Sequence, residues 1–420
     1  MASRPGTTPT ERTRYPREVW VLVGASFLIA VGFGLVAPAL PTFARSFDVG
    51  ITAASVVISA FAFVRLAFAP VSGRLVTRFG ERPTYLVGIA VVAVGSLACA
   101  FAATYWQLLL FRSLSGVGST MFTVSANGLL IRIAPAHLRG RITGLFATSF
   151  LLGSVTGPAL GGGLVALSLR APFLIYGVVL LLVVLLVWLL LRHSTLAARA
   201  QDDGAPTLPF RAALRHPSYR AALASAFANG WLAMGARVSL IPLFVTGALG
   251  QPASFAGVSL AVFAAGEVLA LLFSGRLADS KGRKPLVLTG LSLLTAGTVL
   301  LGQAGQPLFF LLASLLAGLG AGTFSPAQSA TVADLLGTRA RGGSVLAGVQ
   351  MATDVGTIVG PLVAGVIADR LSFTAAFWLS GAVGVLGVLI WLTATETLPR
   401  QGSEAAKEAA GHCQSPEHPK

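Results

Sequence analysis

The chain has 420 residues, of which 55% are hydrophobic and only 11% are charged, and its formal net charge is +15. A water-soluble protein of this length would carry about 25% charged residues, so the composition excludes a soluble globule. The basic residues lie between long apolar runs, as in membrane proteins, and this distribution excludes the nucleic-acid partner that the net charge alone would suggest.

Twelve apolar segments follow one another along the chain, each about as long as a helix that spans a bilayer. They lie near residues 19–43, 51–73, 84–104, 106–131, 142–167, 172–191, 219–247, 253–275, 285–304, 307–333, 343–368 and 373–394. The first run is too long for a signal peptide and lacks a clear cleavage site, so we expect a retained helix. The sequence therefore predicts an all-α membrane protein with twelve transmembrane helices.

Polar segments divide the apolar ones into two sets of six. Residues 192–218 contain several prolines and an Asp-Asp-Gly sequence, which is typical of a linker between domains. Residues 1–18 and 396–420 are polar tails that we expect to be disordered. The predicted domains are two six-helix bundles, 19–191 and 219–395.

The distribution of Lys and Arg predicts the orientation in the membrane. With the N-terminus placed inside, the inside segments hold 24 of the 30 basic residues and the outside loops hold three. Because basic residues remain on the inner side, we expect both termini and the linker to be cytoplasmic in a multi-pass protein of the cell membrane.

The two halves are related by an internal duplication. Gly73 to Pro83 reads GRLVTRFGERP, and 202 residues later Gly275 to Pro285 reads GRLADSKGRKP. The same offset relates further positions in separate regions: Gly116 with Gly318, Gly118 with Gly320, Phe122 with Phe324, and Arg139-Gly140 with Arg341-Gly342. Six-helix halves repeated in parallel are typical of secondary transporters, so the repeat predicts two bundles with a seam between them.

Three signatures make the chain resemble the major facilitator superfamily over about residues 19–394. The first is the loop signature that begins at Gly73 and again at Gly275, and the second is Arg112 followed by two glycines in the fourth span. The third is a pattern in the fifth span, formed by Gly144, Gly153, Gly157, Pro158, Gly161 and Gly162. The fifth-span pattern resembles that of proton-coupled drug antiporters. The resemblance implies export of small amphipathic compounds, with the fifth span as a smooth, bent helix at the seam.

The first copy of the loop signature departs from the family pattern. Thr77 replaces the usual acidic residue and Glu81 stands where a basic residue is expected, whereas the second copy keeps Asp279 and Arg283. The resemblance implies that this loop latches the cytoplasmic side by charge pairs, and our hypothesis is that Asp279 carries the latch. The alternative is that both loops are merely tight, basic turns.

Five charged side chains fall within the predicted spans. They are Arg65, Arg112, Arg237, Glu267 and Asp354. A charge at the centre of a membrane helix costs at least about 2.5–3.5 kcal/mol, so these residues must face the bundle interior, a wet cavity or each other. All five histidines lie in loops or tails. Glu267 and Asp354 are therefore the candidates for binding and releasing a proton.

Arg65 and Glu267 occupy equivalent positions of the repeat, each eight residues before the glycine that opens its loop signature. The resemblance places the second span against the eleventh and the fifth against the eighth. Arg65 and Asp354 then form an ion pair across the seam, which could simply hold one state shut. Glu267 faces the fifth span without an obvious charged partner. We expect Glu267 to be the coupling residue, with substrate contact as the alternative role.

The roles of the other polar and aromatic residues in the spans are less constrained. Arg112 either bonds neighbouring carbonyls or Gln107, or tunes a proton site. The candidate substrate cavity is lined by Asn127, Asn229, Gln350, Phe33 and Trp231, each of which could equally be part of the core.

The sequence predicts a secondary transporter that is not an enzyme. Two cysteines suggest no metal site, and the Gly161–Gly163 run lacks the Lys-Ser/Thr of a phosphate-binding loop, so we expect no metal, no ATP and no cofactor. The expected partners are a small-molecule substrate, protons and lipid, and we expect a monomer. Two alternatives stay open: an importer or permease for a sugar or metabolite, and a receptor or scaffold that does not transport.

Overall fold

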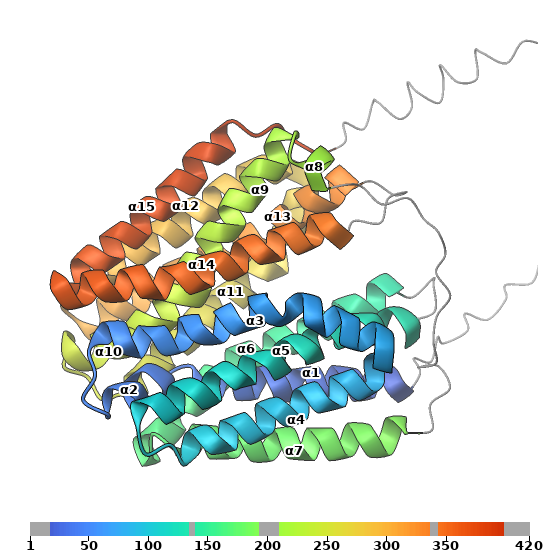
Figure 1. Ribbon diagram of the computed structural model, residues 1–420. Coiled ribbons are helices and arrows are strands. Elements are labelled where there is room, and N and C mark those ends of the chain that lie inside the picture. The colour runs from blue at the N-terminus through green and yellow to red at the C-terminus, as the bar shows by residue number, and fades with distance from the viewer. Residues whose placement is uncertain (1–16, 134–138, 193–209, 337–342, 399–420) are drawn as a thin grey trace, which may run out of the picture.

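The computed structural model describes residues 17–133, 139–192, 210–336 and 343–398, and these residues are almost entirely helical, with no strand among them (Figure 1). Eleven helices in this part of the chain are long and apolar enough to cross a membrane. The all-α membrane fold predicted from the sequence is confirmed. The remaining predicted span is α5 (Tyr105–Ile133), a helix of 29 residues in which six serines and threonines lower the hydropathy.

The helices fall into two groups that follow the order of the repeat. The first group contains α1 (Arg17–Val36), the short α2 (Leu40–Arg45), α3 (Ile51–Phe79), α4 (Glu81–Ala100), α5, α6 (Arg139–Leu167) and α7 (Ala171–Leu191). After the four-residue α8 (Phe210–Ala213), the second group begins with one long span made of α9 (Pro217–Asn229), the π-helical η2 (Gly230–Ala236) and α10 (Arg237–Gly247). It continues with α11 (Ser254–Lys281), α12 (Arg283–Leu301), α13 (Pro307–Leu336), α14 (Gly343–Arg370) and α15 (Phe373–Leu392).

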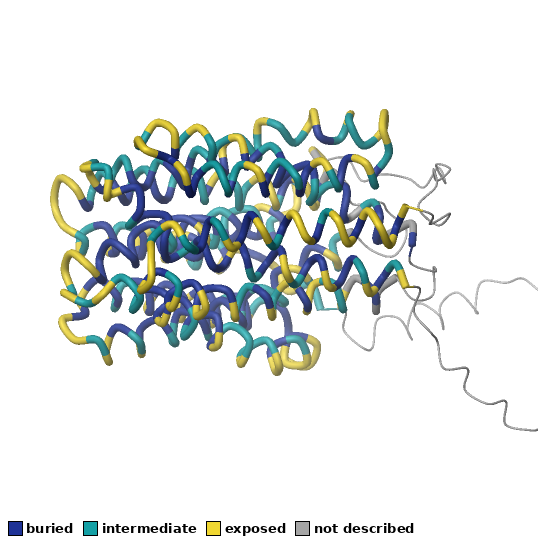
Figure 2. Tube along the Cα trace, turned by 90° about the horizontal axis from the view of Figure 1, so that it is seen from below, coloured by how far each residue is buried: buried dark blue, intermediate teal, exposed yellow. Residues whose placement is uncertain are grey.

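Repeated sequence produces repeated packing. In the first group α5 packs against α3 and α4, and α4 packs against α7; in the second, α13 packs against α11 and α12, and α12 packs against α15. The two groups form two layers that meet along α3 with α14 and along α6 with α11 (Figure 1). Buried residues concentrate in the interior, and exposed residues lie in the turns and on outward-facing sides of helices (Figure 2). These outward sides carry many large apolar side chains, as lipid contact requires.

Close backbone contacts between helices are also repeated. A Cβ atom added to Gly88 would lie 2.8 Å from the carbonyl oxygen of Gly118, and one added to Gly290 would lie 2.9 Å from that of Gly320. Each pair joins neighbouring helices within its own group, and the two pairs are 202 residues apart. Close backbone approach of this kind stabilises helix pairs in lipid, where no hydrophobic effect drives them together.

Each copy of the loop signature is mostly helix and not a loop. The helices α3 and α11 continue to Phe79 and Lys281, beyond the predicted ends at 73 and 275. In each copy the chain then reverses direction at a single glycine. Gly80 has φ = +88° with ψ = 163°, and Gly282 has φ = +104° with ψ = 159°, a region open essentially to glycine alone. The predicted ends of these two spans were wrong because the helix continues through the basic residues that follow the apolar run. It ends only where the backbone turns at Gly80 and Gly282.

We call the end of the molecule that holds Gly80 and Gly282 the basic end, and the opposite end, where α3 begins and α14 finishes, the far end. In Figure 1 the basic end is on the right and the far end is on the left. The predicted tails, 1–18 and 396–420, lie mostly outside the described residues. Their inner edges are described, since α1 starts at Arg17 and the chain is described as far as Leu398.

Replacing Gly282 with alanine should destabilise the protein more than the same change at Gly80. Both changes force a side chain into a glycine-only conformation, which costs about 1–3 kcal/mol. At Gly282 the new Cβ would also lie 2.6 Å from an oxygen of Glu396, whereas at Gly80 the nearest atom is 3.9 Å away. The check is thermal unfolding in detergent, with Gly24→Ala in open space on α1 as the control. Equal melting temperatures for all three variants would contradict the prediction.

Candidate functional site

The two groups of helices are joined by hydrogen bonds at the far end of the seam. The Asp369 carboxylate, in the last turn of α14, accepts from the backbone N–H groups of Ile51 (2.9 Å) and Thr52 (2.6 Å) and from the Thr52 hydroxyl (2.5 Å). These donors form the N-terminus of α3, where a negative charge is favoured by the helix dipole. Asp369 therefore caps a helix of the other half. Nothing in the sequence marks Asp369 for this role, because it lies at the end of a predicted span and outside any motif.

Further contacts close the far end between the halves. The Ser55 and Ser239 hydroxyls lie 2.5 Å apart, and Ser59 donates to the carbonyl of Ile358 at 2.7 Å. The backbones of α6 and α11 also touch, since a Cβ on Gly162 would lie 3.0 Å from the Cα of Gly257. Together with Asp369, these contacts form what we call the far-end closure.

Burial falls toward the basic end along both seam helices. In α3, eight of the nine buried residues lie between Ile51 and Ala62, and in α11 seven of the nine lie between Ala256 and Gly266. The same loss of burial at equivalent positions of the repeat indicates that the seam is sealed at the far end and opens toward the basic end.

Arg65 and Asp354 meet across the seam where burial begins to fall. Arg65 Nη2 lies 4.0 Å from Asp354 Oδ1, and both side chains are partly exposed, at 27% and 16%. Gln350 Nε2 also donates to Asp354 Oδ1 at 3.0 Å. The structure thus brings together the two residues that the sequence analysis paired, and this contact ties α3 to α14 on the open side of the far-end closure.

Glu267 has a charged neighbour that the sequence analysis did not foresee. Its side chain is half-buried, no described residue makes a hydrogen bond to it, and Arg237 interacts with it electrostatically. The expectation that Glu267 lacks a charged partner is wrong because Arg237 belongs to another span, and only folding brings that span to α11.

The two fully buried arginines of the spans each lie over phenylalanine rings. Arg237 Cζ lies 3.1 Å from the ring centroid of Phe263, and Arg112 Cζ lies 4.2 Å from that of Phe61 and 5.9 Å from that of Phe33. The ring faces supply part of the stabilisation that water would give these cations. Gln107 is not the partner of Arg112, because its side-chain oxygen accepts from the backbone N–H of Ala103 instead.

The predicted cavity residues separate into different environments. Trp231 is a core residue whose indole N–H donates to the Ser380 hydroxyl at 3.1 Å, so its proposed place in the cavity is wrong. Phe33 is 39% exposed, Asn229 is half-buried, and Gln350 is exposed beside Asp354. The side chain of Asn127 lies outside the described part of the chain.

The glycine pattern of α6 serves two interfaces. Gly153, Gly157 and Gly161 pack against α1 in the same half, where an added Cβ would lie 2.5 Å from backbone oxygens of α1. Only Gly162 faces α11 across the seam, and Pro158 lies beside both helices, whereas Gly144 lies in open space. The expectation that the whole pattern forms the seam is therefore corrected: the pattern mainly holds α1 and α6 together.

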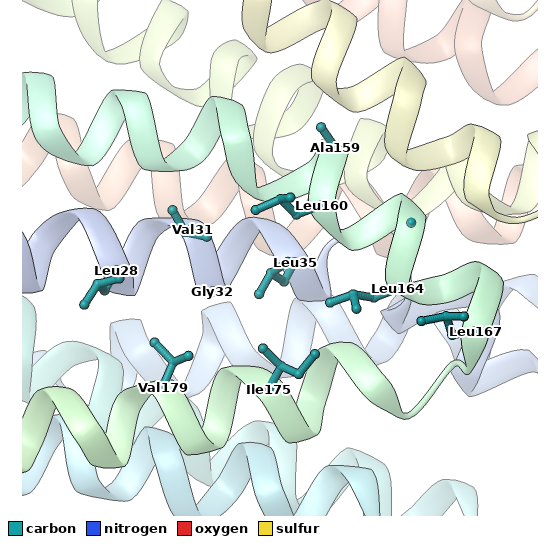
Figure 3. Close-up of a pocket in the computed structure, with 11 residues that line it drawn as sticks. Leu28, Val31, Gly32, Leu35, Ala159, Leu160, Leu164, Leu167, Ile175 and Val179 are labelled. Atoms are coloured by element: carbon teal, nitrogen blue, oxygen red, sulfur yellow. The ribbon is translucent and has the colours of Figure 1, made fainter.

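Helix α6 also borders an apolar groove, which lies between α1, α6 and α7 and has a volume of about 460 Å³ (Figure 3). Its lining residues, which include Leu28, Leu160, Leu164 and Ile175, are all apolar or glycine. No charged residue of the seam lines it, so this groove is distinct from the candidate site.

The charged residues of the second signature act within their own half. Arg283 donates to Asp279 at 2.7 Å, to the carbonyl of Ala278 at 2.7 Å and to Asp334 on α13 at 3.2 Å. Within the described residues Asp279 pairs with Arg283 alone, so the latch across the cytoplasmic side is not formed here. Gly73 and Gly275 lie inside α3 and α11 with open space around them, and neither is required by packing.

Glu396, which lay in the predicted disordered tail, caps the N-terminus of α12. Its carboxylate accepts from the backbone N–H groups of Arg283 (2.9 Å) and Lys284 (3.0 Å) and from those of Thr397 and Leu398 (3.0 Å each). Burial tends to raise the pKa of Glu396, but the four backbone donors outweigh it and hold the pKa below its usual value.

We expect Glu396→Gln to lower the melting temperature at neutral pH and to matter less in acid. A carboxyl whose pKa is depressed in the folded state stabilises that state above its unfolded pKa of about 4.3, and the contribution is lost as pH falls through the folded value. Melting of both proteins in detergent from pH 7.5 to pH 3.5 provides the check. A difference that stays constant or grows in acid would refute the capping role.

Comparisons with known proteins agree with this architecture. The family model described as "Major Facilitator Superfamily" matches residues 22–250 and again 226–415. The chain belongs to this superfamily. It is therefore a multi-pass membrane protein with the fold of secondary transporters. The members of this superfamily are transporters and not enzymes.

Two groups of relatives and one solved structure illustrate the similarity. The chain is 30% identical to the tetracycline resistance protein, class C, of Escherichia coli over 90% of this chain and 96% of the relative. It is 28% identical to the quinolone resistance protein NorA of Staphylococcus aureus over 38% of this chain and 42% of that protein. A bacterial homologue of the human lysosomal transporter Spinster has a TM-score of 0.74 at 15% identity, over 92% of this chain and 97% of that one.

Replacing Asp369 with asparagine should loosen the far-end closure. The change removes the charge from hydrogen bonds that are each worth about 1.5–3 kcal/mol, so the open population should rise at least about tenfold. The readout is the labelling rate of a cysteine at Ser59 by a bulky charged thiol reagent, with Cys99 and Cys413 replaced by serine. A cysteine at exposed Ala103 should label equally in both backgrounds. An unchanged rate at position 59 would show that Asp369 does not hold the closure.

Proposed function

We propose that this protein is a proton-coupled exporter of small amphipathic compounds that works by alternating access. The observation that carries the proposal is the Glu267 carboxylate, which lies half-buried in a seam helix, free of hydrogen bonds from described residues and near Arg237. A carboxylate in this environment can exchange a proton as its surroundings change. The tetracycline and quinolone resistance proteins among its relatives support export as the direction.

The orientation of the molecule follows from its basic residues. The described residues that flank the inside segments of the predicted topology lie at the basic end, and these segments hold most of the Lys and Arg. We therefore place the basic end, both termini and the linker 192–218 in the cytoplasm. The opening of the seam then faces the cytoplasm, which is the loading side of an exporter. The bundles 19–191 and 219–395 act as the two rocking domains, and a monomer contains the whole pathway.

Each charged residue of the seam has a different role in the transport cycle. Ionised Glu267 is stabilised by Arg237, and a proton arriving from the outside neutralises it and releases that attraction. Arg65–Asp354 and Asp369 join the two halves, so they must separate or re-form when the far end opens. Arg112 keeps a buried positive charge beside the seam aromatics and biases protonation of nearby groups. The Asp279–Arg283 pair is then free to form a cytoplasmic latch in the opposite state.

An importer on the same fold remains the second candidate, because the same site could couple uptake to protons. A scaffold without transport is less consistent with a carboxylate held inside the membrane at a cost of about 2.5–3.5 kcal/mol. Direction of transport is what separates the first two.

Expression in a bacterium that lacks its own pumps should lower the accumulation of tetracycline and norfloxacin several-fold. A proton uncoupler should restore accumulation, because export against a gradient depends on proton entry. Equal accumulation with and without the protein across both compounds would refute export.

Glu267→Gln should abolish uphill export and retain exchange of preloaded substrate, because glutamine resembles protonated glutamate and cannot release a proton. Transport in vesicles with an imposed pH gradient, compared with counterflow without one, separates the two activities. Full uphill export by this variant would show that Glu267 is not the coupling residue.

A further inference from the structure

Arg237 carries hydrogen-bond donors inside the membrane that no described residue accepts. The residue is 4% exposed, and neither Nη1 nor Nη2 has a hydrogen-bond partner in the described part of the chain. A buried polar group without a partner costs about 1–3 kcal/mol, and more when it is charged. Buried polar groups in proteins nearly always have a hydrogen-bond partner, so these donors need an acceptor from outside the described residues.

The surroundings of Arg237 combine an aromatic ring and a carboxylate. Phe263 and Glu267 are four residues apart on α11, so they lie one turn apart on the same face of that helix. The guanidinium lies over the Phe263 ring and interacts with Glu267. Arg237 itself begins α10 directly after the π-helical turn of η2, and π-helical turns occur frequently at functional sites.

The balance of charge at this depth argues against a simple cation as cargo. Arg65, Arg112 and Arg237 lie inside the described spans, and Asp354 compensates only Arg65. A singly cationic compound bound at Glu267 would leave Arg237 without its carboxylate and close to a second positive charge. An anionic group on the same compound would remove that repulsion and supply the missing acceptors.

We propose that Arg237 is the anion-binding residue of a substrate subsite, and that the cargo is an aromatic compound with separate acidic and basic groups. Its anionic group accepts from Nη1 and Nη2 of Arg237, its cationic group pairs with Glu267, and its ring packs against Phe263, whose ring must turn aside to admit it.

This inference rests on the proposed function, because it uses Glu267 as the proton-binding residue. A purely anionic cargo would bind better once Glu267 is protonated, which favours movement of proton and cargo together. A cargo whose cation occupies Glu267 competes with the proton instead, and this competition is what exchange requires. The paired charges therefore agree with export driven by proton entry.

The test compares norfloxacin, which carries a carboxylate and a piperazinium, with its ethyl ester, which keeps the cation and lacks the carboxylate. Arg237→Leu should reduce export and binding of norfloxacin at least about tenfold, the equivalent of 1.4 kcal/mol. Binding of the ester should be unchanged or stronger, because the change removes a positive charge beside the bound cation. Arg237→Lys should recover part of the norfloxacin activity, since it restores the charge without the two-pronged geometry. Arg220→Leu, the same change at an exposed position of α9, is the matched control.

Binding is measured on purified protein by quenching of intrinsic fluorescence, so the inference can be judged even if no export occurs. Failure of the wild-type protein to export either compound, with norfloxacin binding still dependent on Arg237, would overturn the proposed function and support the subsite. Equal loss of both compounds in Arg237→Leu, with normal folding by thermal melting, would assign Arg237 a structural role. Unchanged norfloxacin binding in that variant, or wild-type binding of the ester alone, would overturn the inference directly.

Discussion

A charge placed in the interior of a bilayer must be compensated by the protein itself, and this constraint determines where the functional groups of this transporter lie. Lipid offers neither water nor counterions, so a charged side chain in a span has to face the seam, another charge or an aromatic ring. Arg65 meets Asp354 across the seam, Arg112 lies over Phe61, and Arg237 lies over Phe263 near Glu267. The compensating partners come from different helices, so breaking or forming these contacts is coupled to helix movement.

The same constraint explains the unequal ends of the seam. At the far end, Asp369 is held by three donors from α3, and small residues allow the backbones of α6 and α11 to touch. Toward the basic end α3 and α11 lose burial at equivalent positions, and the seam opens. Strong, local polar contacts at one end and less buried seam helices at the other are what one state of an alternating-access transporter requires. The Arg283 cluster, confined to its own half, belongs to the end that is open in this state.

Duplication gives the protein symmetry in packing and asymmetry in charge. The glycine contacts of α4 with α5 recur in α12 with α13, and Gly80 and Gly282 end equivalent helices with the same backbone conformation. Yet Arg65 corresponds to Glu267, and Glu81 corresponds to Arg283. The repeat therefore preserves the backbone contacts that any such bundle needs, while its charged positions have diverged to give each half a different chemical task.

The sequence by itself determined the helical membrane fold, the two matching halves, the superfamily and the five charged residues of the spans, because each of these depends on local composition or on spacing along the chain. It also anticipated the Arg65–Asp354 contact through the resemblance. Only the tertiary structure decided that Arg237 neighbours Glu267, that Trp231 is core, that three glycines of the α6 pattern contact α1, and that Asp369 and Glu396 cap helices far away in sequence. These outcomes depend on which helix faces which and on rotation of each helix about its axis. A nearly uniform apolar helix carries little periodic signal for that rotation, so packing against neighbouring helices sets it.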